Sequence, residues 1–247
     1  MGEIGFGRGT ESGFLKMSVP LIDSRFYGRR KGRPMRVQRQ HDFNELLPKF
    51  SFELPAGAFN PAVLFPFPVQ GVWLEIGFGF GEHLAEMAKS FPQIGMIGCE
   101  VFENGVGNLL STIGEKQLQN IRIFPKPAQS LLKILPEQSI DRVFLLFADP
   151  WPKKRHARRR FVNPENLALL AKILKDGGEF RLASDDHGLI TWISEHMLKN
   201  QDFRWLAETA DDWLKRPEGW PATRYEEKAI AKGIQPVYWR FERIARK

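Results

Sequence analysis

The chain has little cysteine and no long apolar run. Among its 247 residues Cys99 is the only cysteine, which excludes a disulfide within the chain and is typical of a reducing cytosol. No apolar run approaches the roughly 18 residues that a membrane-spanning helix needs, and prolines interrupt the most hydrophobic stretch, 61–69. The N-terminus also lacks the basic and apolar regions of a secretory signal. We therefore expect a cytoplasmic protein that does not contact a membrane.

Acidic residues are missing from two short basic segments. The first basic segment, residues 29–39, contains six lysines and arginines, and the second, residues 153–160, contains six more. Subtracting these twelve from the 36 basic residues leaves 24 against 29 acidic residues, so the net charge of +7 comes from the two segments. A solvated surface mixes both signs, whereas a surface that binds a polyanion concentrates one. The distribution favours a nucleic-acid partner over two merely solvated charge runs.

The rest of the chain alternates between short apolar runs and amphipathic segments. Strands are predicted at 72–76, 94–99, 121–124, 142–147, 179–183, 203–207 and 237–244. Helices are predicted at about 42–47, 82–89, 102–116, 129–135, 164–174 and 189–198, and a glycine pair, Gly177 and Gly178, follows the fifth of these. Repeated β-α-β units of this length predict an α/β fold with a mostly parallel, doubly wound sheet and helices on both faces.

The N-terminal part is rich in glycine and poor in large apolar residues up to about residue 26. Such a composition predicts a flexible arm. We divide the chain into this arm, residues 1–60, which includes the first basic segment, and one domain, residues 61–247.

A glycine loop follows the first predicted strand and precedes a helix. Its spacing is Gly77-x-Gly79-x-Gly81, whereas a dinucleotide-binding loop has the spacing Gly-x-Gly-x-x-Gly. Glu75 stands at the strand end, where a carboxylate repels a pyrophosphate but suits a cationic sulfonium ligand with an ammonium group; we expect it to face the ligand rather than the core. Glu100, at the end of the next strand, is placed to accept ribose hydroxyls. Together these features favour S-adenosylmethionine.

The fourth strand is followed by Asp149-Pro150-Trp151 and then by the second basic segment. Ligand sites in such sheets lie beyond the carboxyl ends of the strands. An Asp-Pro-aromatic sequence there is similar to the substrate clamp of amino-group methyltransferases, and the basic residues beside it suit phosphates. The alternative is a turn that ends the strand and leads into solvated charges.

The sequence resembles the bacterial tRNA (guanine-N7-)-methyltransferase family over roughly residues 26–243. The resemblance is carried by GRRKG (28–32), LEIGFG (74–79), GCEV (98–101), DPWPKKRH (149–156), TRYE (223–226) and RFER (240–243), with Gly233 between the last two. It implies a Rossmann-like class I S-adenosylmethionine-dependent methyltransferase fold with a seven-stranded sheet, so that 61–247 is the methyltransferase domain. It also implies methylation of guanosine 46, in the tRNA variable loop, at N7. We expect the enzyme to be a monomer or homodimer and to bind no metal.

The resemblance assigns functional residues position by position. Residues implied to bind the cofactor are Glu75, Gly77, Gly79, Glu100, Pro127, Ala128 and Asp149. Asp149 also lies where a catalytic carboxylate is expected. Residues implied to bind the substrate are Lys153, Asp185, Thr223, Arg224, Tyr225 and Glu226. The implied tRNA contacts are Arg155, His156, Ala157, Arg158, Arg159 and Arg160, with no acid–base role for His156.

Pro127 departs from the family pattern, which has an acidic or amide residue before Ala128 to hold the adenine. Proline offers no side-chain hydrogen bond. Adenine recognition therefore falls to backbone groups or to a neighbour such as Gln129.

Methylation at guanine N7 needs no general base, because N7 carries a lone pair and no proton. Catalysis then rests on positioning and electrostatics: Asp149 and Asp185 can offset the charge that builds on guanine, and one of them can also read its Watson–Crick edge. Trp151 and Tyr225 are candidates to stack on a splayed-out base, or else belong to the core. Two other functions stay open: methylation of an exocyclic base amine or a protein amide, and a tRNA-binding factor with a degenerate cofactor pocket.

Overall fold

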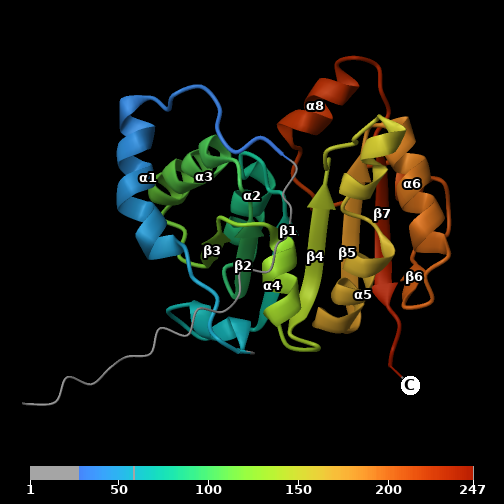
Figure 1. The fold of residues 1–247 in the computed structure, drawn as a ribbon, viewed down its shortest axis with the longest axis horizontal. Coiled ribbons are helices and arrows are strands. Elements are labelled where there is room, and N and C mark those ends of the chain that lie inside the picture. Colours follow the sequence, from blue (N-terminus) through green and yellow to red (C-terminus); the bar gives the residue numbers. More distant parts are fainter. Residues whose placement is uncertain (1–27, 58, 247) are drawn as a thin grey trace, which may run out of the picture.

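The computed structural model describes residues 28–57 and 59–246, and its centre is a seven-stranded sheet in the order β3-β2-β1-β4-β5-β7-β6 (Figure 1). The strands are β1 Gly71–Ile76, β2 Ile94–Cys99, β3 Ile121–Phe124, β4 Ile140–Leu146, β5 Leu174–Ser184, β6 Phe203–Trp205 and β7 Val237–Arg243. Strands β1 to β5 pair in parallel, whereas β7 is antiparallel to both β5 and β6. The predicted mostly parallel sheet is confirmed.

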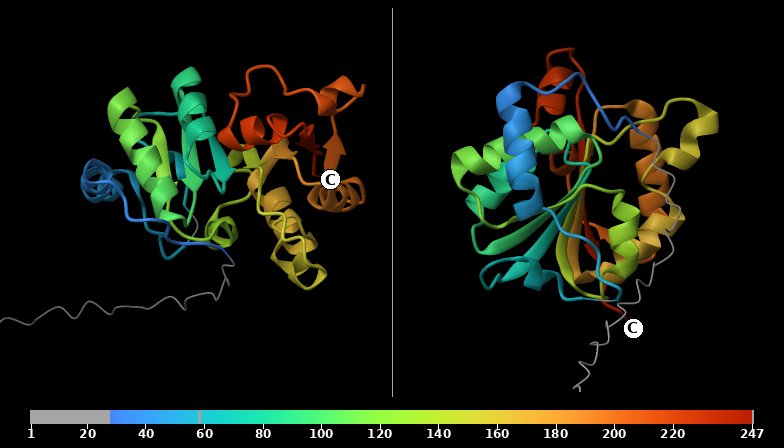
Figure 2. Two further views of the ribbon diagram at one scale, coloured as in Figure 1. Left: turned by 90° about the horizontal axis from the view of Figure 1, so that it is seen from above. Right: turned by 60° about the vertical axis from the view of Figure 1, so that its left-hand side comes forward.

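Helices cover both faces of the sheet, as predicted (Figures 1 and 2). One face carries α2 (Glu82–Ser90) and α3 (Glu103–Lys116), and the other carries α4 (Ala128–Ile134), α5 (Pro164–Ile173) and α6 (His187–Leu198). Side chains of a strand point alternately to the two faces. In β1, Leu74 and Ile76 therefore join the core under α4 to α6, whereas Trp73 joins the core under α2 and α3.

The helix predicted at about 42–47 is longer, and α1 (Val37–Phe50) lies along α3 (Figure 1). Phe43, Leu46 and Leu47 pack against the α2–α3 core, and Phe50 is buried in it. Asp42 accepts a hydrogen bond from Ser111 of α3 at 2.7 Å. Residues 1–27 of the predicted arm lie outside the described residues.

The main local difference from prediction concerns β5. It begins at Leu174, directly after α5, and contains both glycines that were expected to separate the helix from the strand. Gly177 has a φ of 78°, and the pairing with β4 shifts register nearby. Glycine in a strand often marks such a bulge. The short elements η1 (Pro61–Leu64), η2 (Lys154–Arg159), α7 (Asp211–Leu214) and α8 (Arg224–Ile230) were not predicted, and β6 is shorter than expected.

The carboxyl ends of β1, β2 and β4 lie at one edge of the sheet, where α8 and the chain ahead of α1 also lie (Figure 1). This edge holds the candidate site. No helix within residues 28–57 and 59–246 is long and apolar enough to cross a membrane.

Candidate active site

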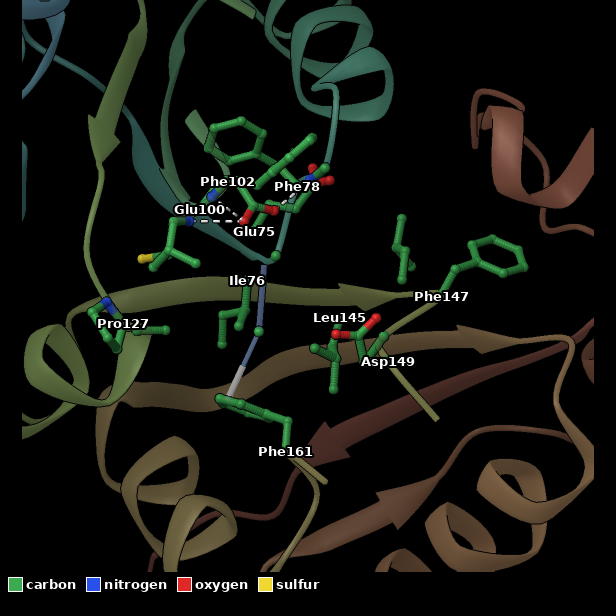
Figure 3. Close-up of a pocket in the computed structure, with 18 of the residues that line it drawn as sticks. Glu75, Ile76, Phe78, Glu100, Phe102, Pro127, Leu145, Phe147, Asp149 and Phe161 are labelled. Atoms are coloured by element: carbon green, nitrogen blue, oxygen red, sulfur yellow. Dashed lines mark hydrogen bonds between the residues drawn. The ribbon is translucent and has the colours of Figure 1, made fainter. Parts of the chain in front are cut away.

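A cavity of about 460 Å³ opens at this edge of the sheet (Figure 3). It brings together all seven residues implied to bind the cofactor, along with residues of α8 and of both basic segments. The predicted site residues that line it are Glu75, Gly77, Gly79, Glu100, Pro127, Ala128, Asp149, Arg158, Arg159, Arg160, Thr223 and Tyr225. Its volume lies in the usual range for a small-molecule site.

The glycine loop forms part of the cavity wall. Gly77 and Gly79 have φ values of 70° and 57°, in the left-handed region that favours glycine. A Cβ atom on Gly77 would meet no atom within 4 Å, so the backbone there faces open space. A Cβ atom on Gly79 would lie 3.3 Å from the ring of Tyr225, so this ring covers the loop closely.

Glu75 lines the cavity but is also buried beneath it. Its carboxylate points to the α2 side of the sheet, is 3% exposed, and lies 2.7 Å from Nδ1 of His83. Because a carboxylate accepts hydrogen bonds, we assign Nδ1 of His83 as the donor. The expectation that Glu75 faces the ligand rather than the core is corrected. The residue lines the cavity, but its carboxylate is also buried against His83.

His83 was missed in the sequence. It is 2% exposed, its ring packs edge-on against Phe144 at 4.7 Å, and its Nε2 is buried without a hydrogen-bond partner among the described residues. Its place in the first turn of the helix after the glycine loop was a signal, because a side chain there points back toward the strand end.

Glu100 is held by backbone amides. Its Oε2 accepts a hydrogen bond from Gly79 N at 2.9 Å, and its Oε1 accepts from Val101 N and Phe102 N at 2.8 and 2.9 Å (Figure 3). Loss of solvation raises the pKa of this carboxyl, although the three amides favour its charged form. A carboxylate offers about four acceptor positions, so room for one further hydrogen bond remains on Oε2.

Pro127 is the N-cap residue of α4, and Lys126, Ala128 and Gln129 line the cavity beside it. The first amides of a helix have no acceptor within the helix. Backbone donors of Ala128 and Gln129 therefore lie at the position where the family usually has a polar side chain.

Asp149 stands in a strained loop. Phe147 and Trp151, two residues to either side, have φ values of 51° and 45°, which costs a non-glycine residue on the order of 1–3 kcal/mol. Arg160 secures the loop, because its Nε donates to Pro150 O at 2.9 Å and its Nη2 to Trp151 O at 3.4 Å. Asp149 is exposed, yet partial loss of solvation at the cavity raises its pKa.

The second basic segment divides into two parts. Lys153, Arg155 and Arg158 are exposed. Arg159 lies over the ring of Trp151 at 4.8 Å, and Arg160 lies over the ring of Trp192 at 4.9 Å. The exposed residues are free to meet a polyanion, whereas Arg159 and Arg160 brace the loop.

His156 and Ala157 are half-buried and do not line the cavity. The ring of His156 packs edge-on against Trp151 at 5.9 Å. Partial loss of solvation, together with the charges of the surrounding arginines and Lys153, lowers the pKa of His156.

The four residues 223–226 play different structural parts. Thr223 and Tyr225 line the cavity, and Tyr225 is 43% exposed. Arg224 donates to Glu82 at 2.5 Å, which attaches α8 to the helix after the glycine loop.

Glu226 is 3% exposed and lies in a buried network behind the cavity. It accepts a hydrogen bond from Tyr238 at 2.6 Å and forms a capping box with Thr223. Asp185, at the carboxyl end of β5, and Lys153 are also absent from the cavity lining.

The part of the chain that the structure describes contains no group of three or more histidine, cysteine, aspartate or glutamate side chains arranged to hold a metal ion.

Known proteins resemble the chain over most of its length. The family model described as "Putative methyltransferase" matches residues 70–238. The tRNA (guanine-N(7)-)-methyltransferase of Rhodospirillum rubrum is 47% identical over 232 residues, covering 92% of this chain and 91% of that protein. The protein of the same name from Paramagnetospirillum magneticum is 45% identical over 243 residues, covering 97% and 100%.

The solved structure of PH0851 has a TM-score of 0.53 at 13% identity, covering 71% of this chain and 43% of that one, which is a likeness of fold alone. The seven-stranded sheet is that of the class I S-adenosylmethionine-dependent methyltransferases. From its sequence matches, this chain belongs to the tRNA (guanine-N7-)-methyltransferase family.

Proposed function

We propose that this protein transfers the methyl group of S-adenosylmethionine to N7 of guanosine 46 in the tRNA variable loop. The observation that carries the proposal is the meeting, at one cavity, of the glycine loop, the Asp149 loop and both basic segments. Relatives that share nearly half of the residues are named for methylation of tRNA at guanine N7.

The residues of the cavity fit this cofactor. The Glu75 carboxylate suits an ammonium group, the remaining acceptor position of Glu100 suits one ribose hydroxyl, and the amides at the start of α4 suit adenine. Gly77 leaves the space between them open. The cofactor supplies a methyl group bound to a positively charged sulfur, and the neutral thioether that remains after transfer is a good leaving group.

Asp149 is the proposed catalytic carboxylate. Positive charge moves from the sulfonium to the guanine ring during the transfer, and a carboxylate fixed near the base offsets it. The brace from Arg160 holds the loop in place before substrate arrives. Asp185, half-buried at the end of the neighbouring strand, is the second candidate to meet the base.

Tyr225 and Trp151 are the proposed stacking surfaces for a splayed-out guanine. Tyr225 lies over Gly79 and is 43% exposed, so a planar base can reach its ring. Trp151 lines the same cavity, with Arg159 over its ring. We assign Arg224 and Glu226 to positioning α8 rather than to direct contact.

Exposed cations near the cavity are the proposed phosphate contacts, with Arg155 and Arg158 foremost in the second basic segment. We further propose that the protein acts in the cytoplasm, where its substrate is, as a monomer or homodimer. The division into an arm, residues 1–60, and a domain, residues 61–247, is revised in this proposal, because α1 packs on α3 and buries Phe50 in the core of the catalytic domain.

Incubation with bulk tRNA and methyl-labelled S-adenosylmethionine, followed by nucleoside analysis, tests this function. We expect label in N7-methylguanosine, and little label with Asp149→Asn. Label in an exocyclic methylamine would favour base-amine methylation, and label in protein would favour an amide substrate. Binding of tRNA without binding of cofactor would favour the degenerate binding factor.

A further inference from the structure

Asn104, in the first turn of α3, grips the backbone of the first basic segment. Its Oδ1 accepts a hydrogen bond from Gly32 N at 2.7 Å, and its Nδ2 donates to Arg33 O at 2.8 Å. The amide of the preceding residue, Glu103 N, donates to Arg30 O at 2.9 Å. Three hydrogen bonds thus tie an otherwise irregular stretch to the start of a helix.

Gly32 is required for this grip. A Cβ atom at this position would lie 2.6 Å from Oδ1 of Asn104 and 3.1 Å from the ring of Phe102. Both distances are shorter than ordinary van der Waals separations, so a larger residue would displace either the segment or the Asn104 side chain that holds it. The glycine and the asparagine therefore form a matched pair.

The grip directs the first basic segment to the active-site cavity. The chain ahead of α1 runs from that helix across the carboxyl edge of the sheet (Figure 1). Its Gly28 and Arg29 line the same cavity as Arg158 and Tyr225. The two basic segments, more than a hundred residues apart in the sequence, therefore meet at one cavity.

The segment presents its charges to solvent. Arg29, Arg33 and Arg36 are exposed. Lys31 lies 3.5 Å from Glu103, but both side chains are exposed, so this pair contributes little to holding the segment. The backbone hydrogen bonds hold the segment while the side chains of Arg29, Arg33 and Arg36 stay exposed.

We propose that the first basic segment, held on α3 by Asn104, is a second surface for the RNA backbone, acting beside the second basic segment. Asn104 is a positioning residue, and Arg29, Arg33 and Arg36 are the phosphate contacts. The identity of the RNA as tRNA rests on the proposed function. A segment fixed before binding does not lose conformational entropy when RNA binds, so its arginines contribute more to affinity.

Asn104→Ala tests the positioning because it removes the grip and keeps every charge. We expect its Kd for bulk tRNA to rise about tenfold, since the variant lacks two hydrogen bonds that order the segment. Its Kd for S-adenosylmethionine should stay within about twofold of the wild-type value, and trypsin should cleave after Lys31 and Arg36 faster. Asn200→Ala is the matched control, because it removes a side-chain hydrogen bond to Asp202 N ahead of β6. It should change neither the Kd for tRNA nor the rate of trypsin cleavage in the first basic segment.

The double variant Arg33→Gln/Arg36→Gln tests the role of the charges directly. For each arginine that binds a phosphate, its replacement should reduce the slope of log Kd against log salt by about 0.7 to 0.9. An unchanged slope would overturn the proposal even if Asn104→Ala failed to fold. Wild-type tRNA affinity in a folded Asn104→Ala protein would overturn the positioning role. Product analysis separates this proposal from the proposed function. Binding of tRNA without formation of N7-methylguanosine would refute the proposed methylation but not the role of the first basic segment in RNA binding.

Discussion

Replacing Glu75 by glutamine should weaken cofactor binding while largely sparing the fold. The amide of glutamine still offers a carbonyl oxygen to Nδ1 of His83, which the carboxylate contacts at 2.7 Å. The change therefore removes the negative charge and keeps the buried hydrogen bond. Alanine, in contrast, removes both.

The expected loss of binding follows from the charge. Two unit charges about 4 Å apart interact by about 4 kcal/mol near a protein surface, which is an upper bound here because desolvation opposes it. A net loss of about 2–3 kcal/mol corresponds to roughly 30- to 150-fold weaker binding of S-adenosylmethionine.

The expected loss of stability differs between the two variants. In Glu75→Gln the free energy of unfolding should fall by less than about 1 kcal/mol. In Glu75→Ala it should fall by about 2–3 kcal/mol, because His83 would be left buried with neither ring nitrogen paired.

Calorimetric titration with S-adenosylmethionine and urea unfolding of the same samples measure both effects. Glu86→Gln is the control, because it removes one charge from α2, the helix that carries His83, but from a carboxylate that pairs with Lys116 outside the cavity. Wild-type cofactor affinity in Glu75→Gln would refute the role of this charge. Equal stability of the glutamine and alanine variants would refute the buried pairing with His83.

Three further predictions concern other parts of the molecule. Arg155→Gln and Arg158→Gln should each lower the salt slope of tRNA binding by about 0.7 to 0.9 without changing cofactor affinity, and an unaltered slope would mean that these side chains are only solvated. Asp149→Asn and Asp185→Asn should lower kcat far more than tRNA affinity in single-turnover and binding assays, and near-normal turnover would remove them from catalysis. Burial opposes the charge of Glu179, but its arginine partners lower its pKa to about 2. The ionised carboxylate therefore stabilises the fold fully above about pH 4.5, and this contribution fades as the pH falls toward 2. Glu179→Gln should therefore cost about 1–2 kcal/mol in urea unfolding at pH 7 and progressively less at lower pH, whereas a pH-independent difference would contradict this origin.

The architecture could be predicted because its signals are local. Buried parallel strands are continuous apolar runs, such as 142–147, and the glycines after β1 mark a turn that only a few folds use. The cofactor residues follow from the same logic, since strand ends in a parallel sheet meet at one edge. Glu75, Glu100 and Asp149 do line one cavity.

Long-range packing explains what could not be predicted. Nothing near Glu226 in the sequence indicates that Tyr238 would bury its carboxylate, or that Arg160 would turn back to the carbonyl of Pro150. The glycines of β5 predict a boundary between helix and strand, but a bulge and a turn have the same composition. The grip of Asn104 on the first basic segment likewise joins residues 72 positions apart.

Site mapping on a single tRNA tests the central claim most directly. N7-methylation makes guanine cationic and labile, so reduction followed by aniline should cleave a modified transcript at guanosine 46 only. A transcript with adenosine at that position should neither accept label from S-adenosylmethionine nor be cleaved. Cleavage at other guanosines, or labelling that survives the replacement by adenosine, would contradict methylation of one variable-loop guanosine at N7.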